Sequence, residues 1–316
     1  MKAAIINKFG DPEVFEISDI SEPIPGPDEI QIEVLSGSIN PIDWKQRRGK
    51  HRFLFGSPFP IVLGYDVAGI ITKLGSDIEG FHPGDKICGV LSNKYGGGLG
   101  QFAKGKPDCF AKVPESIDHV NSAALPLAGL TALQALRDKG KIKKDYKVLI
   151  IGAAGGVGHF AVQIAEIFRA KVYSVSSEKH KSFLEKISNS TFIDYQITDI
   201  LSLDLKFDII FDTIGNYSFP KCKKLLLPGG IYITTLPRPK IILHKLLSLF
   251  SNGKKAKTLL MKHSADDLKQ LLDWLESGKL KICIDKEFSI IDISDAHKYS
   301  EEGHSEGKIL IRYDWG

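Results

Sequence analysis

The spacing of hydrophobic residues changes along the chain, and the change predicts two kinds of structure. Residues 148–151 are all apolar, as in a strand buried on both faces of a parallel sheet. After a glycine-containing turn, apolar residues recur at helical spacing over 157–168, which predicts a helix packed against that strand. Further strands are predicted at 171–175, 207–211, 231–235 and 258–261. Strands that alternate with helices predict a doubly wound parallel sheet over residues 122–279.

The flanking regions have a different pattern. Residues 1–121 contain short β-rich runs interrupted by Pro and Gly, which predicts an irregular β-barrel-like domain. Residues 122–136 are apolar nearly all round, as in a helix buried between domains. The segment 264–275, with Ser264 as its N-cap, is predicted as the last helix of the central domain. The β-rich tail, 280–316, is expected to return to the first domain.

Composition indicates an ordinary soluble protein. The 316 residues are 43% hydrophobic and 25% charged, enough for two domains with proper cores. The net charge of +4 is spread along the sequence, so binding to nucleic acid or to an acidic membrane is not indicated by charge alone. No apolar run approaches the ~18 residues of a membrane span, and the first residues lack a signal-peptide pattern, so we expect a cytoplasmic protein. The cysteines form no CxxC pair, which argues against a disulfide scaffold or a structural zinc lobe: Cys88, Cys109, Cys222 and Cys283.

The turn after the first central strand carries candidate binding chemistry. Its glycines are Gly152, Gly155 and Gly158, in a GxxGxxG pattern, because Ala153 stands where the usual GxGxxG fingerprint has glycine. Backbone amides at such a turn and helix N-terminus receive a dinucleotide pyrophosphate. A tight turn without a ligand is the alternative. The strands and helix around it favour a dinucleotide site.

The end of the second central strand bears on the choice of cofactor. NAD-binding versions of this unit carry an acidic residue there, which bonds the ribose diol and repels a 2′-phosphate. Here the chain has Ser176 and Ser177, followed by Lys179 and Lys181. Hydroxyl groups and cations suit a phosphate, which favours NADPH. The alternative for each lysine is a solvated helix surface, and Glu178 beside them weakens the case.

Together these residues give the chain a resemblance to the medium-chain dehydrogenase/reductase superfamily. Within it the chain resembles the zinc-independent quinone oxidoreductase branch, and most of all the enone oxidoreductases and chloroplast-envelope quinone oxidoreductase homologues. The resemblance spans nearly the whole chain. It is carried by the glycine turn and by NPIDWK at 40–45, GYDVAG at 64–69, ALPLAGLTA at 124–132 and GKIL at 307–310.

The resemblance implies a fold, a cofactor and a set of site residues. We expect a GroES-like catalytic domain, 1–121 plus 280–316, and a Rossmann NADPH-binding domain, 122–279, with the cofactor in a cleft between them. Its substrate would be a small enone, alkenal or quinone, and the protein a homodimer. The expected cofactor-binding residues are Gly155, Gly156 and Val157 at the pyrophosphate, Ser176, Ser177, Lys179 and Tyr195 at the 2′-phosphate and adenosine, Asn40 and Thr131 near the nicotinamide, and Lys45 and Lys308.

The resemblance also implies a mechanism, in which hydride adds to the β-carbon of an α,β-unsaturated carbonyl. Charge on the carbonyl oxygen must then be stabilised, and Lys45 is the best candidate because it touches both cofactor and substrate. Tyr65 is a second catalytic candidate, or equally a packing residue. Many quinone oxidoreductases have tyrosine in place of Lys45, so the lysine in this chain favours enone reduction. The proton donor is left open, since water would serve. The rival hypotheses are quinone reduction and a non-catalytic, crystallin-like protein that associates with RNA.

Two further expectations concern metal and membrane. Zinc-dependent relatives hold their metal through Cys and His at the places that read 40–43 and 64–66 here, and neither residue type occurs there, so we expect no metal. The segment 238–257 combines apolar residues with lysines at both ends, as in an interfacial helix. A lid over the substrate or a subunit contact is the favoured alternative for this segment.

Overall fold

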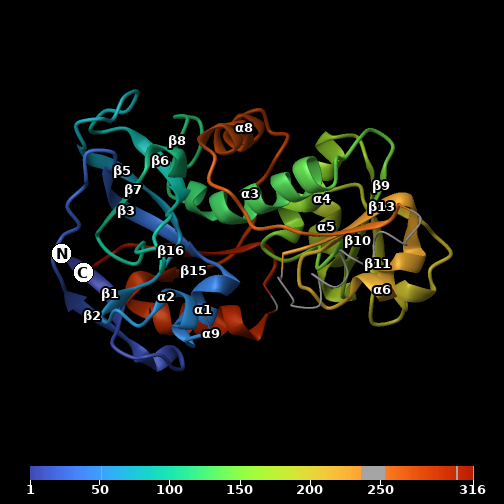
Figure 1. The fold of residues 1–316 in the computed structure, drawn as a ribbon, viewed down its shortest axis with the longest axis horizontal. Helices are drawn as coiled ribbons and strands as arrows, with labels where there is room; N and C mark the ends of the chain where they lie inside the picture. The colour runs from blue at the N-terminus through green and yellow to red at the C-terminus, as the bar shows by residue number, and fades with distance from the viewer. Residues whose placement is uncertain (51, 236–252, 304, 316) are drawn as a thin grey trace. The chain divides into compact units, whose positions relative to one another are not determined.

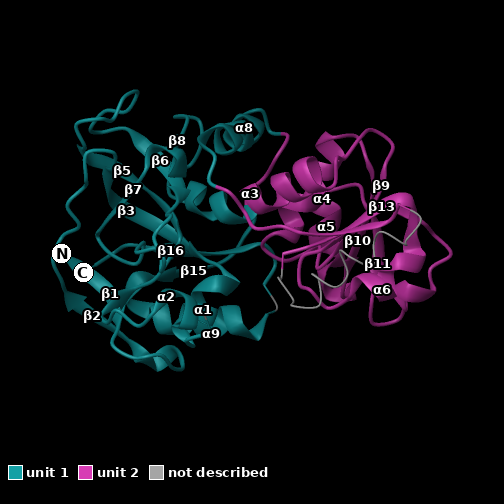
Figure 2. Cartoon of the chain, in the orientation of Figure 1, with its two compact units in different colours: residues 1–128, 263–278, 282–316 teal, residues 129–262, 279–281 magenta. Residues whose placement is uncertain are grey.

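The computed structural model describes all residues except 51, 236–252, 304 and 316. Its chain forms two compact units (Figure 2). Unit 1 consists of residues 1–128, 263–278 and 282–316, and unit 2 of residues 129–262 and 279–281. These limits differ from the expected domains, because residues 122–128 and 263–278 lie in unit 1 and residues 280–281 lie in unit 2.

Unit 2 contains a six-stranded sheet with the order β11-β10-β9-β12-β13-β14 (Figure 1). Every neighbouring pair is parallel, which confirms the predicted doubly wound sheet. The strand order reverses between β9 and β12, where α/β proteins of this kind bind their ligands. The strands are β9 (Lys147–Ile151), β10 (Lys171–Ser176), β11 (Thr191–Asp194), β12 (Phe207–Asp212), β13 (Leu226–Thr234) and β14 (Lys255–Thr258).

The last of these strands corrects the sequence prediction. A strand was expected at 258–261 because those residues are apolar, but β14 is Lys255–Thr258 and Leu260 is 84% exposed. An edge strand pairs on one side only, so it does not need an apolar sequence. In β14 only Ala256 is buried. The apolar run therefore misplaced the strand by three residues.

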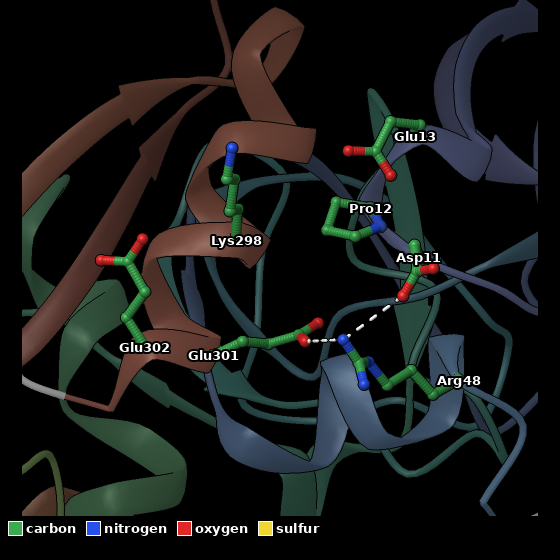
Figure 3. Close-up of a pocket in the computed structure, with 7 residues that line it drawn as sticks. All are labelled: Asp11, Pro12, Glu13, Arg48, Lys298, Glu301 and Glu302. Atoms are coloured by element: carbon green, nitrogen blue, oxygen red, sulfur yellow. Dashed lines mark ion pairs between the residues drawn. The ribbon is translucent and has the colours of Figure 1, made fainter.

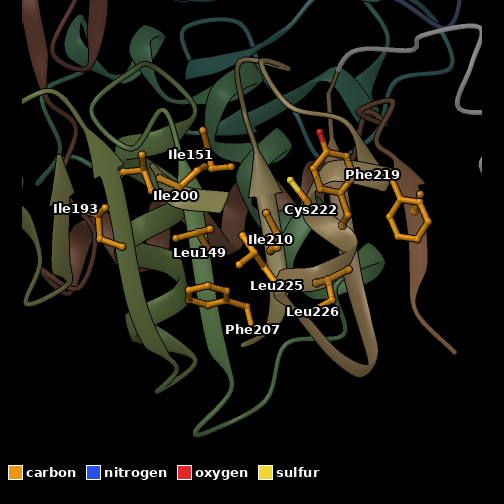
Figure 4. Close-up of a cluster of buried hydrophobic side chains, with 13 residues drawn as sticks. Leu149, Ile151, Ile193, Ile200, Phe207, Ile210, Phe219, Cys222, Leu225 and Leu226 are labelled. Atoms are coloured by element: carbon orange, nitrogen blue, oxygen red, sulfur yellow. The ribbon is translucent and has the colours of Figure 1, made fainter. Parts of the chain in front are cut away.

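Helices cover the sheet of unit 2 and enclose its core. The principal one, α4 (Gly158–Ile167), buries most of its length, as its periodicity predicted. The others are the short α5 (Lys181–Ile187) and α6 (Phe219–Cys222). One core cluster joins side chains of β9, β12, β13 and α6 (Figure 4), among them Leu149, Ile151, Phe207, Ile210, Phe219 and Leu226.

Unit 1 is built on a larger sheet with the order β15-β16-β3-β5-β6-β8, with β7 also paired to β3. Its C-terminal strand pairs antiparallel with β3, so the tail does return to the first sheet. The strands are β3 (Ile30–Ile39), β5 (Asp66–Leu74), β6 (Lys86–Val90), β7 (Phe102–Gly105), β8 (Phe110–Lys112), β15 (Ile284–Ser289) and β16 (Lys308–Arg312). A second, three-stranded sheet contains β1 (Lys2–Ile6), β2 (Phe15–Asp19) and β4 (Ile61–Val62).

The helices of unit 1 include the element that holds Lys45, one of the two expected catalytic residues; Tyr65, the other, lies just before β5. This element, α1 (Pro41–Arg47), follows β3 directly. The predicted helix start at Ser264 is confirmed, since its hydroxyl accepts a hydrogen bond from the Asp267 backbone N–H at 3.1 Å. The helix belongs to unit 1, however, and not to the central domain as predicted. The other helices are α2 (Arg52–Phe55), α8 (Ala265–Glu276) and α9 (Ile293–Glu302), with α3 (Pro126–Gln134) crossing from unit 1 to unit 2.

Most of the segment 238–257 lies outside the described residues, which resume at 253. Residues 253–257 form a turn and the start of β14, not a helix. Among the residues that the structure describes, no helix is long and apolar enough to cross a membrane.

Candidate active site

The glycine turn of unit 2 lies at the point where the strand order reverses. Gly152 has a φ of +78°, which favours glycine. A Cβ on residue 158 would stand 2.0 Å from the carbonyl oxygen of Gly152, so only glycine lets α4 begin this close to the turn. The backbone N–H groups of Gly156 and Val157 donate to no acceptor among the described residues. Two free amides beside a helix N-terminus suit a pyrophosphate.

The end of β10 presents hydroxyl groups and a cation. Ser176 and Ser177 are buried, and neither hydroxyl has a partner in the described part of the chain. The backbone N–H of Tyr195 donates to the carbonyl oxygen of Ser176 at 3.2 Å, which brings the expected adenosine residues together. Lys179 is exposed and makes no ion pair with a described residue, whereas Lys181 lies 3.5 Å from Glu178. These residues therefore offer hydroxyl groups and a cation, the groups that a phosphate ligand would contact.

Thr131, the remaining expected residue of unit 2, lies in α3. Its side chain is 6% exposed. The other expected residues, Asn40, Lys45, Tyr65 and Lys308, all belong to unit 1.

Asn40 is fixed at the start of α1 by interactions on both ends of its side chain. It is the N-cap residue, followed by a proline at the first helical position. Its side-chain amide donates to Asp66 Oδ2 at 2.7 Å, and its side-chain oxygen accepts a hydrogen bond from Lys308 Nζ at 2.6 Å. Asn40 is therefore held in a single orientation.

Lys308 lies in a buried network and not on an open surface. Its ammonium group also donates to the carbonyl oxygen of Ile39 and to the Asp66 carboxylate, both at 3.3 Å. All three ammonium protons are thus used inside the protein, and a direct contact from Lys308 to a cofactor stays a prediction.

Asp66 is the central acceptor of this network, and the sequence analysis did not single it out. Its Oδ2 accepts from the Ser38 hydroxyl at 2.7 Å, and its Oδ1 accepts from the Leu127 amide at 2.8 Å. The carboxylate therefore also caps the first turn of α3. A carboxylate directly before an apolar strand, in GYDVAG, was the signal that could have revealed it.

A second buried carboxylate, Asp43, was also missed as a functional group. Its Oδ2 accepts from the Asn40 amide at 2.7 Å, which closes the N-terminus of α1. Its Oδ1 is buried without a hydrogen-bond partner among the described residues. Burial, reinforced by the negative charge of Asp66, raises the pKa of Asp43 to about 7.

Lys45 is half-buried on α1, and its ammonium group has no hydrogen-bond acceptor in the described structure. Its Nζ stands 5.3 Å from the centre of the Trp44 ring. Burial, and then the nearby charge of Lys50, lower the pKa of Lys45. Lys45 therefore offers free donors in a partly desolvated place, as an oxyanion-stabilising group requires.

The hydroxyl group of Tyr65 is already engaged in hydrogen bonds and is not a free proton donor. Its hydroxyl donates to the carbonyl oxygen of Lys94 at 2.6 Å and accepts from Gln46 Nε2 at 2.7 Å. Burial raises the pKa of Tyr65 to about 12. In this arrangement the phenol ties α1 to the glycine-rich loop after β6, which agrees with the packing alternative.

A metal-binding cluster and a surface pocket are two other kinds of site that the described residues could form. No cluster of three or more His, Cys, Asp or Glu side chains among them could hold a metal ion. A surface pocket of ≈ 450 Å³ on unit 1 contains the ion pair between Arg48 and Glu301 (Figure 3). None of the expected site residues lines it. Its lining residues are Asp11, Pro12, Glu13, Arg48, Lys298, Glu301 and Glu302.

Comparison with known proteins identifies the class to which this fold belongs. Residues 26–115 match the alcohol dehydrogenase GroES-like domain, and residues 189–311 match the zinc-binding dehydrogenase family. A GroES-like domain combined with a Rossmann-like parallel sheet is the domain pair of the medium-chain dehydrogenase/reductase superfamily. The chain belongs to the medium-chain dehydrogenase/reductase superfamily, in the branch of the quinone oxidoreductases and the enone and alkenal reductases.

Individual relatives match over nearly the whole chain. The chloroplast envelope quinone oxidoreductase homolog of Arabidopsis thaliana is 30% identical, over 93% of this chain and 93% of its own length. The NADPH-dependent alkenal/one oxidoreductase of the same plant is also 30% identical, over 98% of this chain and 79% of its own. The structure of the quinone oxidoreductase from Coxiella burnetii superimposes with a TM-score of 0.90 at 29% identity and covers 99% of both chains.

Proposed function

We propose that this protein is an NADPH-dependent reductase of the activated C=C bond in α,β-unsaturated carbonyl compounds. The observation that carries the proposal is the ammonium group of Lys45, half-buried and without an acceptor among the described residues. Such a group stabilises negative charge on a substrate oxygen more strongly than a solvated lysine does, because little water screens it. One relative in the same branch is an NADPH-dependent alkenal/one oxidoreductase.

The residues of unit 2 support NADPH as the cofactor. The free amides of Gly156 and Val157 would hold the pyrophosphate, and the hydroxyls of Ser176 and Ser177 with the cation of Lys179 would hold the 2′-phosphate. When bound, the reduced nicotinamide supplies a hydride.

The substrate chemistry then follows from charge. Hydride addition forms a C–H bond at the β-carbon. The C=C π pair then forms a double bond between the α-carbon and the carbonyl carbon, and the C=O π pair moves onto the oxygen, which gives an enolate. Lys45 stabilises that oxygen with a charge-assisted hydrogen bond. Protonation at the α-carbon, by water, gives the saturated carbonyl compound. Asn40, held by Asp66 and Lys308, fixes the start of the helix that carries Lys45.

We propose that the reaction needs no zinc, although one matching family is described as zinc-binding. Support comes from the residues at the places that zinc-dependent relatives use. They contain no Cys or His, and Asn40 and Asp66 are bonded there to Lys308. Turnover in the presence of a strong chelator tests this, and loss of activity that added zinc restores would refute it.

Quinone reduction is the second candidate, favoured by the similarity to the chloroplast envelope quinone oxidoreductase homolog of Arabidopsis and to the quinone oxidoreductase of Coxiella. The deciding experiment measures kcat/KM for NADPH oxidation with a panel of enones and alkenals against a panel of 1,4-quinones, each repeated with NADH. Higher values for enones with NADPH support the proposal. Higher values for quinones favour the second candidate. No oxidation with either panel would favour the non-catalytic alternative.

Two further expectations remain proposals, namely a homodimer and a cytoplasmic location. Light scattering coupled to size-exclusion chromatography tests the first, and fractionation of the source cells tests the second.

A further inference from the structure

Lysines gather at one edge of the unit 2 sheet. All six strands are parallel, so their amino-terminal ends share an edge, opposite the one that carries the glycine turn and Ser176. The segments that enter β9, β12, β13 and β14 are rich in lysine. We call the following residues the amino-edge lysines: Lys139, Lys141, Lys206, Lys223, Lys224, Lys254, Lys255 and Lys257.

The contacts among these residues show that they form one surface. Lys206 Nζ donates to the carbonyl oxygen of Lys224 at 2.7 Å, and Lys254 Nζ donates to that of Lys223 at 3.0 Å. A third such bond, of 2.6 Å, joins Lys257 Nζ to the carbonyl oxygen of Lys139. In each of these bonds the ammonium group of one lysine binds the backbone of another lysine of the same surface.

The charges of this surface act on one another. Burial and the charges of Lys206 and Lys223 lower the pKa of Lys254. Burial lowers the pKa of Lys257 as well, and so do the charges of Lys255, Lys141 and Lys139. Since residues 254 and 255 are adjacent in the chain, the two groups are continuous.

Neighbouring acidic residues do not neutralise the surface. No amino-edge lysine forms an ion pair with a described carboxylate, whereas lysines of unit 1 such as Lys73 and Lys106 do. Of the nearby acids, Asp138 pairs with Arg137 and Asp208 accepts the backbone N–H of Lys147. Asp145 and Asp204 are exposed. The whole chain carries only +4, so the rest of it is net negative.

We propose that the amino-edge lysines dock unit 2 onto the surface of an anionic lipid bilayer. Clusters of four to eight lysines are typical of binding to anionic headgroups, with each lysine near the surface contributing to the affinity. The composition argues against nucleic acid. None of the amino-edge residues is an arginine, which makes bidentate contacts, and Arg137 beside them is paired with Asp138. The nearby aromatic residues Tyr146 and Phe207 are half-buried and fully buried, so neither is free to stack on a base.

The proposal is tested by sedimentation of the full chain with vesicles of phosphatidylcholine containing about 30% phosphatidylserine. The test variant replaces Lys141, Lys224 and Lys255 with Gln, because these three ammonium groups make no bond to a described residue and their loss removes only charge. At roughly fivefold per lysine, we expect the partition coefficient to fall on the order of 100-fold. Binding of the unchanged protein should also weaken steeply from about 50 to about 300 mM KCl.

The matched control removes the same charge from exposed lysines of unit 1 whose ammonium groups make no bond to a described residue, as Lys8→Gln, Lys94→Gln and Lys298→Gln. The control should bind like the unchanged protein. Equal loss in both triple variants, or equal binding to pure phosphatidylcholine vesicles, would overturn the proposal. So would tighter binding to a duplex RNA than to the anionic vesicles at equal phosphate concentration. If the test variant does not fold, the salt series and the neutral vesicles still decide.

Discussion

The ammonium group of Lys308 donates a hydrogen bond to the side-chain oxygen of Asn40 across 2.6 Å. The same group lies 3.3 Å from the carboxylate of Asp66, and all three side chains are buried. One lysine at the start of β16 thereby joins the N-terminus of α1 to the start of β5. Charges buried in this way are strongly coupled, because little water is available to screen them.

Replacing Lys308 with Met should therefore destabilise the protein. The Asp66 carboxylate would be left buried without its cation, which typically costs about 3–5 kcal/mol of the free energy of unfolding. Urea denaturation measures this. Lys8→Met, at an exposed position, is the control and should change stability by less than about 0.5 kcal/mol. A loss below about 1 kcal/mol for the Lys308 variant would show that the pair is not important for stability.

Asp43 should make the free energy of unfolding depend on pH between the pKa of its carboxyl group in the unfolded chain and the higher pKa in the folded protein. Its pKa is raised from 3.8 to about 7 in the folded protein, so the folded state binds the proton more tightly. Stability from this group is fully present below about pH 4 and is lost as the pH rises through 7. Asp43→Asn keeps an acceptor for the Asn40 amide and removes the titration.

The measurement compares urea denaturation of both proteins at pH 5 and pH 8. The stability of the unchanged protein relative to the variant should fall by roughly 2–3 kcal/mol between these values. A difference that stays constant with pH would mean that Asp43 does not titrate in this range.

Local patterns predicted the central sheet well. The apolar run at 148–151 and the helical spacing after it correspond to β9 and α4, and Ser264 caps α8. Such features depend on neighbours in sequence, which periodicity and capping preferences report directly. The glycine turn also followed from local spacing, since the close approach at Gly158 leaves no room for a side chain.

Features that depend on distant pairing could not be predicted. Lys308 meets Asn40 because β16 pairs with β3, which the residues around either position do not reveal. The clustering of lysines at one sheet edge has the same cause. Their charges are spread through the sequence, and only the parallel strand order gathers them. β14 was misplaced because an edge strand lacks the apolar pattern of a central one.

Two glycine-to-alanine substitutions in the glycine turn should have different costs in stability. A Cβ on residue 158 would lie 2.0 Å from a backbone oxygen that cannot move away, whereas a Cβ on Gly155 would make an ordinary contact of 3.5 Å. Gly158→Ala should therefore cost about 3 kcal/mol of unfolding free energy, and Gly155→Ala less than about 1 kcal/mol. Urea denaturation of both variants checks the difference. Equal costs would contradict the close packing of α4 on the turn.

Lys179 should set the preference for NADPH. Lys179→Ala removes a free cation at the expected 2′-phosphate site, and loss of a charge-assisted bond worth about 1.5–3 kcal/mol should weaken NADPH binding about tenfold or more. NADH binding should not change. Lys181→Ala is the matched control, because that lysine already interacts with Glu178. Fluorescence titration gives both dissociation constants, and an equal change for the two cofactors would exclude a phosphate contact.

Lys45 offers the sharpest test of the proposed chemistry, because Lys50 provides a natural control. The Nζ atoms of both lysines lie 5.3 Å from the centre of the Trp44 ring, but Lys50 is exposed and Lys45 is half-buried. Lys45→Ala should lower kcat for a small enone such as methyl vinyl ketone about 100-fold, through lost stabilisation of the enolate oxygen. Lys50→Ala should change it less than about threefold.

The pH profile separates a charge effect from a packing effect. Because the pKa of Lys45 is lowered, activity should decline on the alkaline side before an ordinary lysine would lose its proton. Lys45→Arg keeps the charge at all accessible pH values, so whatever activity it retains should not show that decline. If Lys45→Ala and Lys50→Ala lose activity equally, or if the alkaline decline persists in Lys45→Arg, then the ammonium group of Lys45 does not stabilise the reacting oxygen.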